Sequence, residues 1–275
     1  MLATSERTVV WFSCGAASAV AAKMAVEKYG DPDVVYCDTL ASEHPDNARF
    51  FGDIQRWIGK SITVIKSAKY EDIDDVFERE RYMAGIAGAR CTVEMKKVPR
   101  LNYQRADDIH IFGYTVDEHE RIEKFKKNNP ELTLDWILRD RFIRKVDCYR
   151  ILEEAGIALP EMYALGFEHN NCAGCVKATS PSYWQRTAKH FPEVFARRAK
   201  QSREIGARLV RIQGVRCFLD EMPLDAEYSE PDGDIECGPY CSPGLFDASL
   251  DLSLRSQTVD DRGLCSISPN DLFLI

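Results

Sequence analysis

The sequence predicts an α/β fold in which a parallel sheet carries helices on both faces, with a smaller cysteine-containing C-terminal extension. Three observations lead to this prediction. Short apolar runs alternate with helical patterns over the first 115 residues. That alternation is typical of a parallel sheet that is covered on both sides. The chain has 275 residues and 45% hydrophobic content, which is enough for one main core and an appendage.

The first two strands flank a helix. TVVWF at 8–12 predicts a buried strand because it is short, continuous and apolar. Small and apolar residues then recur at helical spacing up to Gly30, a residue typical of helix ends. DVVYCD at 33–38 predicts the second strand, which brings Asp38 to its carboxyl end.

Two more strands complete the predicted sheet. PDNARFFGDIQRWIG predicts a helix that begins at Pro45 and Asp46 and ends near Gly59. SITVIKS at 61–67 predicts the third strand, and IHIFGYT at 109–115 predicts the fourth after a mostly helical stretch. Ligands of such sheets bind beyond the carboxyl ends of the strands, so chemistry is expected there.

The turn after the first strand, SCGAAS at 13–18, is the first candidate binding site. Free N–H groups and the dipole of the following helix favour an anion there. Gly15 allows close approach of the backbone, and Ser13 and Ser18 offer hydroxyl groups, while Ala16 and Ala17 keep the turn uncrowded. The turn lacks both the P-loop and the dinucleotide fingerprint, and a plain packing turn explains the same residues.

Charge is unevenly spread along a chain whose formal net charge is -8. The segment 184–211 has eight Lys/Arg against two Glu, and 217–261 has twelve Asp/Glu against one Arg. The first segment is either a docking face for phosphates or a solvated helix surface. The N-terminus has about five consecutive apolar residues, fewer than a signal peptide or a membrane span needs. We therefore expect a cytoplasmic protein that does not contact a membrane.

Ten cysteines are more than a reduced protein of this length needs for packing, which favours metal or sulfur chemistry. Cys37 and Cys148 lie in apolar runs and are expected to be buried. Two other pairs stand on turn-forming residues, C-x-x-C in CAGC and C-x-x-x-C in CGPYC. Two such pairs match a four-thiolate site for Zn²⁺ or a [4Fe-4S] cluster, and a redox pair or uncoordinated thiols are the alternative. The proposed metal ligands are Cys172, Cys175, Cys237 and Cys241, with Cys91 and Cys217 as substitutes.

Several of these motifs, taken in order, resemble the PP-loop ATP pyrophosphatases, which are the adenine nucleotide alpha hydrolase superfamily. SCGAASAV is similar to the S-G-G-x-D-S loop of that superfamily, with Cys14 and Ala17 where many members have Gly and Asp. RCTVEMKKVP and FGYTVDEHERI resemble segments of its PAPS reductase branch, and NNCAGCVKA resembles a cysteine pair of many members. The resemblance spans roughly 8–241.

The resemblance implies that the turn holds the phosphates of ATP with Mg²⁺. ATP-using members cleave between the α and β phosphates, attach AMP to an acceptor oxygen and let a sulfur nucleophile displace AMP. It also implies nucleotide-binding residues and catalytic residues at the edge of the sheet. The nucleotide-binding residues would be Ser13, Cys14, Gly15, Ala16, Ala17, Ser18, Asp38, Gly113 and Glu118, and the catalytic residues Arg90, Cys91, Lys96 and Arg121.

Each of these side chains also has a plain structural explanation. Asp38 can cap the turn that follows its strand. Arg90 and Lys96 can be solvated surface cations. Glu118 and Arg121, three residues apart, can form a helical ion pair.

We expect 1–165 to form the nucleotide-binding α/β domain and 166–275 a helical and irregular C-terminal region with the cysteine site. The resemblance to thiolases and phosphorothioation enzymes favours iron–sulfur over Zn²⁺. It implies sulfur insertion into nucleic acid, DNA or tRNA, with a sulfur donor such as a cysteine desulfurase; a homodimer is compatible with it. IECGPYC partly matches the C-terminal Glu-Cys-Gly-x-His of PAPS reductases, so PAPS reduction to sulfite is the first alternative. A nucleotide-binding subunit without turnover is the second, because Ala17 replaces the loop carboxylate.

Overall fold

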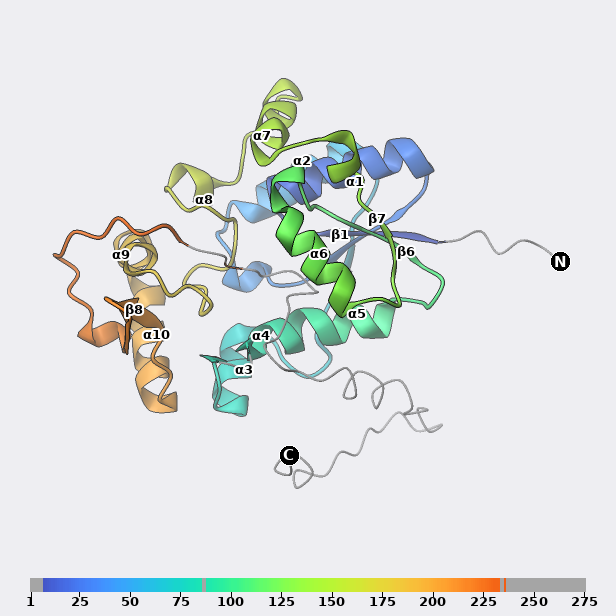
Figure 1. The fold of residues 1–275 in the computed structure, drawn as a ribbon. Coiled ribbons are helices and arrows are strands. Elements are labelled where there is room, and N and C mark those ends of the chain that lie inside the picture. Colours follow the sequence, from blue (N-terminus) through green and yellow to red (C-terminus); the bar gives the residue numbers. More distant parts are fainter. Residues whose placement is uncertain (1–6, 86–87, 233–234, 236–275) are drawn as a thin grey trace, which may run out of the picture.

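The computed structural model describes residues 7–85, 88–232 and 235. A parallel sheet of five strands is its centre, in the order β3-β2-β1-β6-β7 (Figure 1). The strands are β1 (Thr8–Phe12), β2 (Asp33–Cys37), β3 (Thr63–Ile65), β6 (Ile109–Phe112) and β7 (Thr133–Asp135). All four pairings are parallel, with Val10 opposite both Val34 and Ile111. The predicted parallel α/β fold is confirmed.

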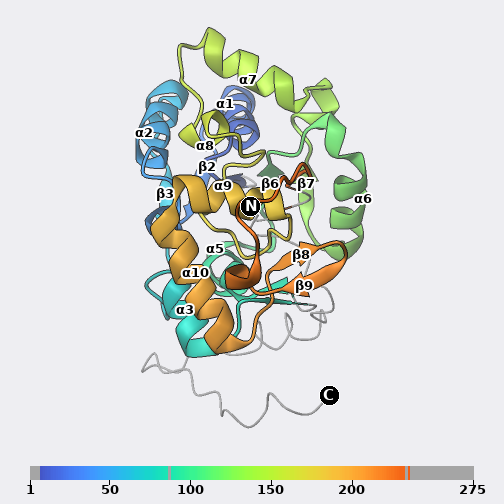
Figure 2. The same ribbon diagram turned by 90° about the vertical axis from the view of Figure 1, so that its left-hand side faces the viewer.

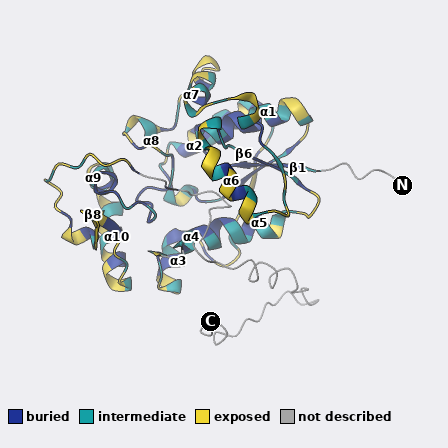
Figure 3. Ribbon diagram, viewed as in Figure 1, coloured by how far each residue is buried: buried dark blue, intermediate teal, exposed yellow. Residues whose placement is uncertain are grey.

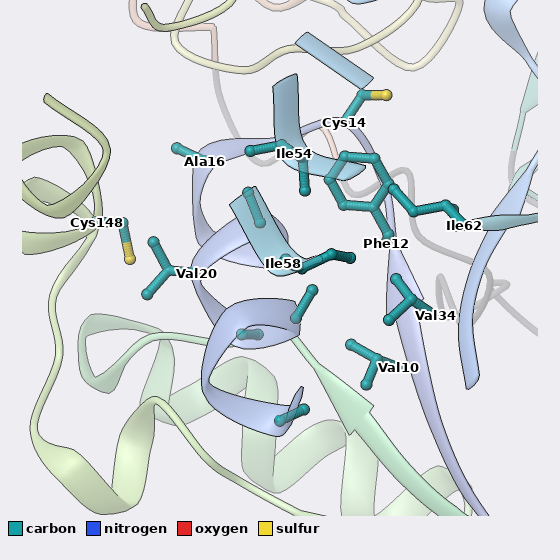
Figure 4. Packing of buried hydrophobic residues seen from close by; sticks show 14 of the residues in the cluster. Val10, Phe12, Cys14, Ala16, Val20, Val34, Ile54, Ile58, Ile62 and Cys148 are labelled. Atoms are coloured by element: carbon teal, nitrogen blue, oxygen red, sulfur yellow. The ribbon is translucent and has the colours of Figure 1, made fainter. Parts of the chain in front are cut away.

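Helices cover both faces of the sheet. One face carries α1 (Ala16–Tyr29), α2 (Asn47–Ile58) and α7 (Lys145–Glu154), which pack on Val10, Phe12 and Val34. Figure 4 shows this layer, with Cys14 at the end of β1. The other face carries α5 (Val98–Tyr103) and α6 (His119–Asn128), packed on Val9 and Trp11. The outer sides of α6 and α7 are exposed, whereas β1 is buried (Figure 3). This pattern explains why β1 reads as a continuous apolar run.

A second apolar cluster lies beyond the carboxyl ends of the strands, toward α9 and α10 in Figure 1. It joins Tyr70 and Phe77 to Met162, Trp184 and Leu219, so it draws on both sides of residue 165. Its helices and hairpins are α3 (Ile73–Glu80), α4 (Arg90–Thr92), α8 (Glu161–Ala164), α9 (Pro181–His190), α10 (Pro192–Ile205), β4 (Ala84–Gly85) with β5 (Gly88–Ala89), and β8 (Val210–Ile212) with β9 (Val215–Cys217).

Short helices link these elements. They are η1 (Leu40–Ser42), η2 (Val93–Lys97), η3 (Val116–Glu118), η4 (Arg139–Arg141) and η5 (Leu219–Glu221). The four predicted strands and two predicted helices are present, although β3 and β6 are shorter than the predicted runs. The edge strand β7 was not anticipated, because three half-exposed residues carry too short an apolar pattern. In the described part of the chain, no helix is both long and apolar enough to cross a bilayer.

Candidate functional site

The sheet changes its winding direction between β1 and β6. From β1 the chain proceeds to β2 on one side, and β6 begins the other side. The segments after β1 and β6 therefore leave the sheet toward opposite sides at its carboxyl edge, which is where ligands of open α/β sheets bind. The candidate turn 13–18 lies at this point, as the sequence predicts.

The turn is closed by its own hydroxyl groups. Ser18 Oγ accepts from the backbone N–H of Ser13 at 3.1 Å and donates to the carbonyl of Gly15 at 2.9 Å. Ser13 Oγ also donates to Ser18 Oγ, at 3.2 Å. Gly15 precedes α1 in extended backbone (φ -94°, ψ 155°). Both serines are thus engaged within the turn.

Cys14 takes the left-handed backbone conformation, with φ 55°. That conformation favours glycine, so a side chain there must be held by its surroundings. Cys14 is fully buried. Burial raises the pKa of its thiol well above the ordinary range, and the charge of Glu43 adds to this while Lys96 opposes it.

A buried polar network holds this turn. Asn170 Nδ2 donates to the carbonyl of Cys14 at 2.7 Å and to Asn47 Oδ1 at 2.9 Å. Asn47 Nδ2 in turn donates to Glu43 Oε2 at 2.7 Å, and Thr39 Oγ1 donates to Glu43 Oε1 at 2.6 Å. Because a carboxylate only accepts, the chain of bonds fixes the orientation of both amides. The network ties the turn after β1 to α2 and to the segment before the C-x-x-C.

Tyr163 reaches the start of α1. Burial raises the pKa of its hydroxyl, and Tyr149 adds to this, while hydrogen bonds from the backbone of Ala16 and Asn170 lower it. The two tyrosine rings lie 5.4 Å apart. One first-turn amide of α1 is therefore already satisfied by Tyr163, whereas the amides of Ala17 and Ser18 have no acceptor within the helix.

Gly113 follows β6 and packs directly against this helix start. A Cβ on Gly113 would lie 2.6 Å from Ser18 N and 2.8 Å from the Ala17 carbonyl carbon. Glycine is required there by close contact between backbones. The predicted nucleotide-binding role of Gly113 thus acquires a packing explanation, because the space beside it is filled by α1.

Asp38 stands at the carboxyl end of β2, as predicted. Its Oδ1 accepts from Leu40 N at 3.3 Å, and its Oδ2 pairs with Lys66 at 3.0 Å. It therefore performs the turn-capping role. It also lines a hollow of about 900 Å³ above β2 and β3. The other lining residues are Lys66, Ser67, Ala68, Lys69, Tyr70, Glu71, Asp72, Asp74, Asp75, Glu78, Arg79 and Met95.

Arg90 is an ion-pair centre, 3.0 Å from Glu80 and 2.8 Å from Glu94. Its Nε is buried without a partner in the described residues. Burial raises the pKa of Glu94, although Arg90 opposes this. Cys91, half-buried, packs against the second apolar cluster.

Lys96 belongs with the turn after β1. It is buried, and its positive charge lowers the pKa of both Cys14 and Cys37 against the effect of burial. Among the cations predicted to be catalytic, Lys96 is the one whose charge lowers the pKa of Cys14 in the turn. Cys37 and Cys148 are buried, as the sequence predicts.

Glu118 and Arg121 form the helical ion pair that is their plain explanation. Glu118 also accepts from Thr115 N at 2.9 Å and from Thr115 Oγ1 at 3.1 Å, which caps the helix after β6. Beside them, Lys145 Nζ donates to the Glu168 carbonyl at 2.7 Å. Burial lowers the pKa of His169, and the charges of Lys145 and Arg121 lower it further. A group of cations therefore lies beside the helix that follows β6.

The structure describes two of the four cysteines of the predicted metal site. Cys172 and Cys175 are buried on one turn, where Tyr183 Oη accepts from Cys175 N at 2.7 Å and donates to the Cys172 carbonyl at 3.3 Å. Ala173 N donates to the Ser42 carbonyl at 3.0 Å, which attaches this turn near η1. Cys237 and Cys241 lie outside the described residues. Within the described ranges no three metal-ligating side chains come together.

The basic segment 184–211 is largely paired. Trp184 and Arg198 are buried, and Arg198 bonds to Asp74 and to Gln201. Arg203 lies 2.6 Å from Asp220, and Arg186 pairs with Asp232. The acidic segment that follows thus neutralises part of the basic one.

Sequence reasoning did not identify the residues that hold the turn. Glu43 and Asn47 share one stretch of the chain, whereas Tyr163 and Asn170 come from more than 110 positions later. The only local signal is the NNC sequence at 170–172. Its cysteine points to the predicted metal site, and nothing in the sequence indicates that Asn170 holds the distant turn.

No family model and no curated protein matches this chain. Among solved structures, the chain is similar to the phosphoadenylyl-sulfate (PAPS) reductase from Candida auris in its phosphate complex, with a TM-score of 0.46 and 11% identity. That match covers 62% of this chain and 82% of the reductase. The strands, their order and the covering helices are those of an open parallel α/β fold.

Proposed function

We propose that this chain is a PAPS reductase-like PP-loop ATP pyrophosphatase that adenylates an acceptor for sulfur insertion, with nucleic acid as the acceptor. One observation carries the proposal. The start of α1 lies at the switch point of the sheet, behind a turn whose left-handed Cys14 is held by a buried network. Such a network is expected where a turn must keep one shape for a ligand.

The chain's own residues supply binding and charge neutralisation. The amides of Ala17 and Ser18 and the dipole of the 14-residue α1 would face the phosphates. Lys96, whose field already acts on Cys14, would offset negative charge on the phosphates. An acceptor oxygen would attack the α-phosphorus, the bond to the β-phosphate would break, and pyrophosphate would leave. A sulfur nucleophile would then displace AMP from the adenylated acceptor.

The resemblance to the PP-loop ATP pyrophosphatases implies Mg²⁺, but the turn after β1 offers no free carboxylate oxygen among the described residues to bind it. Residues 13–18 contain no carboxylate, and both oxygens of buried Glu43 are occupied by Thr39 and Asn47. We therefore derive no step through a metal held by this turn. Neutralisation falls on backbone amides and on Lys96.

The thiolate site fits the cluster proposal in its described half. Cys172 and Cys175 are buried on a turn next to Asn170, which holds Cys14 and precedes Cys172 by two positions. A [4Fe-4S] cluster with Cys237 and Cys241, when bound, would supply the sulfur-rich or electron-carrying centre of the reaction. Zn²⁺ is the alternative occupant of the same four ligands.

The test measures pyrophosphate released from ATP under anaerobic conditions, with and without single-stranded DNA or tRNA. We expect release that nucleic acid stimulates and that Gly15→Val abolishes. Gly52→Val is the matched control, because the nearest atom to a Cβ there is the flexible Arg56 guanidinium at 3.5 Å. Sulfite formed from PAPS with a thiol donor would overturn the proposal in favour of a reductase. ATP binding without either product would identify a non-catalytic subunit.

A further inference from the structure

The turn between β7 and α7 displays an aromatic ring to solvent. Phe142 is 80% exposed, and its φ of 56° is in the left-handed region. It ends η4, with its N–H donating to the Arg139 carbonyl at 2.9 Å. Ile143 N then donates to the Leu138 carbonyl at 3.0 Å, a pattern typical of helix ends where glycine is usual.

The conformation is costly for a large side chain, and Phe142 gains little burial to offset it. Cys14, another left-handed residue, is buried and held by Asn170. Glycine at 142 would close the same turn without strain and without an exposed ring. Arg81 and Gln213 take the same conformation with exposed polar side chains, so the feature that sets Phe142 apart is an exposed aromatic ring that the fold itself does not need.

The surroundings of the ring are basic, although the whole chain carries -8. Residues 139–150 hold five Lys/Arg against two Asp, which is a local excess of three positive charges. Arg141 is exposed and its guanidinium makes no ion pair or hydrogen bond within the described ranges. The Arg144 side chain is 59% exposed, and among the described residues its guanidinium pairs with Asp147 alone, at 3.2 Å. Arg141 and the outer part of Arg144 are therefore available to an external anion.

This turn is attached to the edge of the candidate site. Val116 N, just after β6, donates to the Ile143 carbonyl at 3.0 Å. Lys145 N donates to Asp117 Oδ2 at 3.1 Å, immediately before Glu118. In Figure 2 the segment between β7 and α7 runs along the upper edge of the molecule on the side of α6. A polymer bound here would pass along the carboxyl edge of β6.

We propose that Arg141, Phe142 and Arg144 form a docking platform for single-stranded nucleic acid, in which a base stacks on the Phe142 ring and phosphates contact the two guanidinium groups. An exposed ring flanked by cations is how proteins hold single strands without reading sequence. A duplex keeps its bases stacked on one another and cannot use the ring. The inference rests on the proposed function, because it locates where the acceptor would dock.

The test measures binding of a fluorescently labelled oligonucleotide by anisotropy, with the full chain and without ATP. Phe142→Ala should weaken binding of single-stranded DNA or RNA by roughly 5- to 150-fold, and Phe142→Tyr should keep it. Arg141→Gln should reduce the slope of log affinity against log salt by about 0.7. Lys189→Gln, which removes an exposed cation from 184–211, is the matched control and should change nothing.

Folding provides a second readout. Phe142→Gly should melt at the same or a higher temperature while binding is lost, because it relieves strain and uncovers no core. Equal affinity of wild type and Phe142→Ala, equal affinity for duplex and single strand, or a loss confined to Lys189→Gln would each overturn the platform. The proposed function fails separately, through absent pyrophosphate release while oligonucleotide binding and its Phe142 dependence persist.

Discussion

Replacing Asn170 by alanine tests whether the buried network holds the turn after β1. Asn170 Nδ2 donates to the Cys14 carbonyl and to Asn47 Oδ1, and all three residues are at least nine-tenths buried. The substitution leaves two buried acceptors unsatisfied, each at a cost of about 1–3 kcal/mol. It also removes Asn170 Oδ1, which is itself buried without a partner in the described residues, and so relieves one penalty of the same size.

The substitution therefore leaves a net of one unsatisfied buried acceptor, which should lower the free energy of unfolding by about 2 kcal/mol. For a chain of this size that corresponds to a fall in melting temperature of about 4–8 °C. Nucleotide affinity should fall as well, because Cys14 is no longer held in its left-handed conformation. Thermal unfolding with and without ATP measures both effects.

Asn171→Ala is the control for this substitution. Asn171 is half-buried and makes a single 3.3 Å bond to the Ile235 carbonyl, so its removal should cost about 0.5 kcal/mol. A melting temperature of Asn170→Ala within about 1 °C of the control would refute the assignment, because an acceptor left buried and unsatisfied must cost more than that.

Three further predictions concern other parts of the chain. Gly113→Ala should destabilise the fold by about 1–3 kcal/mol in chemical denaturation, because its Cβ would meet the backbone of α1 at 2.6 Å. Gly15→Val should keep its stability, since the nearest atom to a Cβ there lies at 3.7 Å; equal losses in both variants would contradict this. Burial lowers the pKa of His110 to about 4, and its Nδ1 accepts from Trp11. The folded state therefore disfavours the protonated imidazole, so stability is complete above about pH 6.5 and is lost as the pH falls toward 4, by roughly 2 kcal/mol between pH 7.5 and 5. His110→Gln should flatten that dependence, and an unchanged slope would assign it to other groups. Anaerobically purified protein should contain about four irons per chain, and Cys175→Ser should lose them; stoichiometric zinc would replace the cluster by a zinc site, and no bound metal would exclude both.

The sequence by itself determined the local elements and their order. The apolar run at 8–12, the helix stop at Gly30 and the run 33–38 predict β1, α1 and β2 because burial on both faces of a strand, helical spacing and glycine termination act within a few residues. The position of turn 13–18 at the sheet edge follows from the same order. The predicted burial of Cys37 and Cys148 depended on local apolar patterns in the same way.

Only the tertiary structure decided which distant groups meet. The bond from Asn170 to Cys14 spans 156 positions, and no periodic pattern records such a pair. The opposite charges of 184–211 and 217–261 were visible in the sequence, yet their mutual pairing through Arg203 and Asp220 required the fold. The exposed ring of Phe142 was equally hidden, since an apolar residue in sequence does not reveal whether its turn faces the core or solvent. Hydrophobic periodicity specifies elements, whereas a site depends on long-range contacts that the folded chain alone brings together.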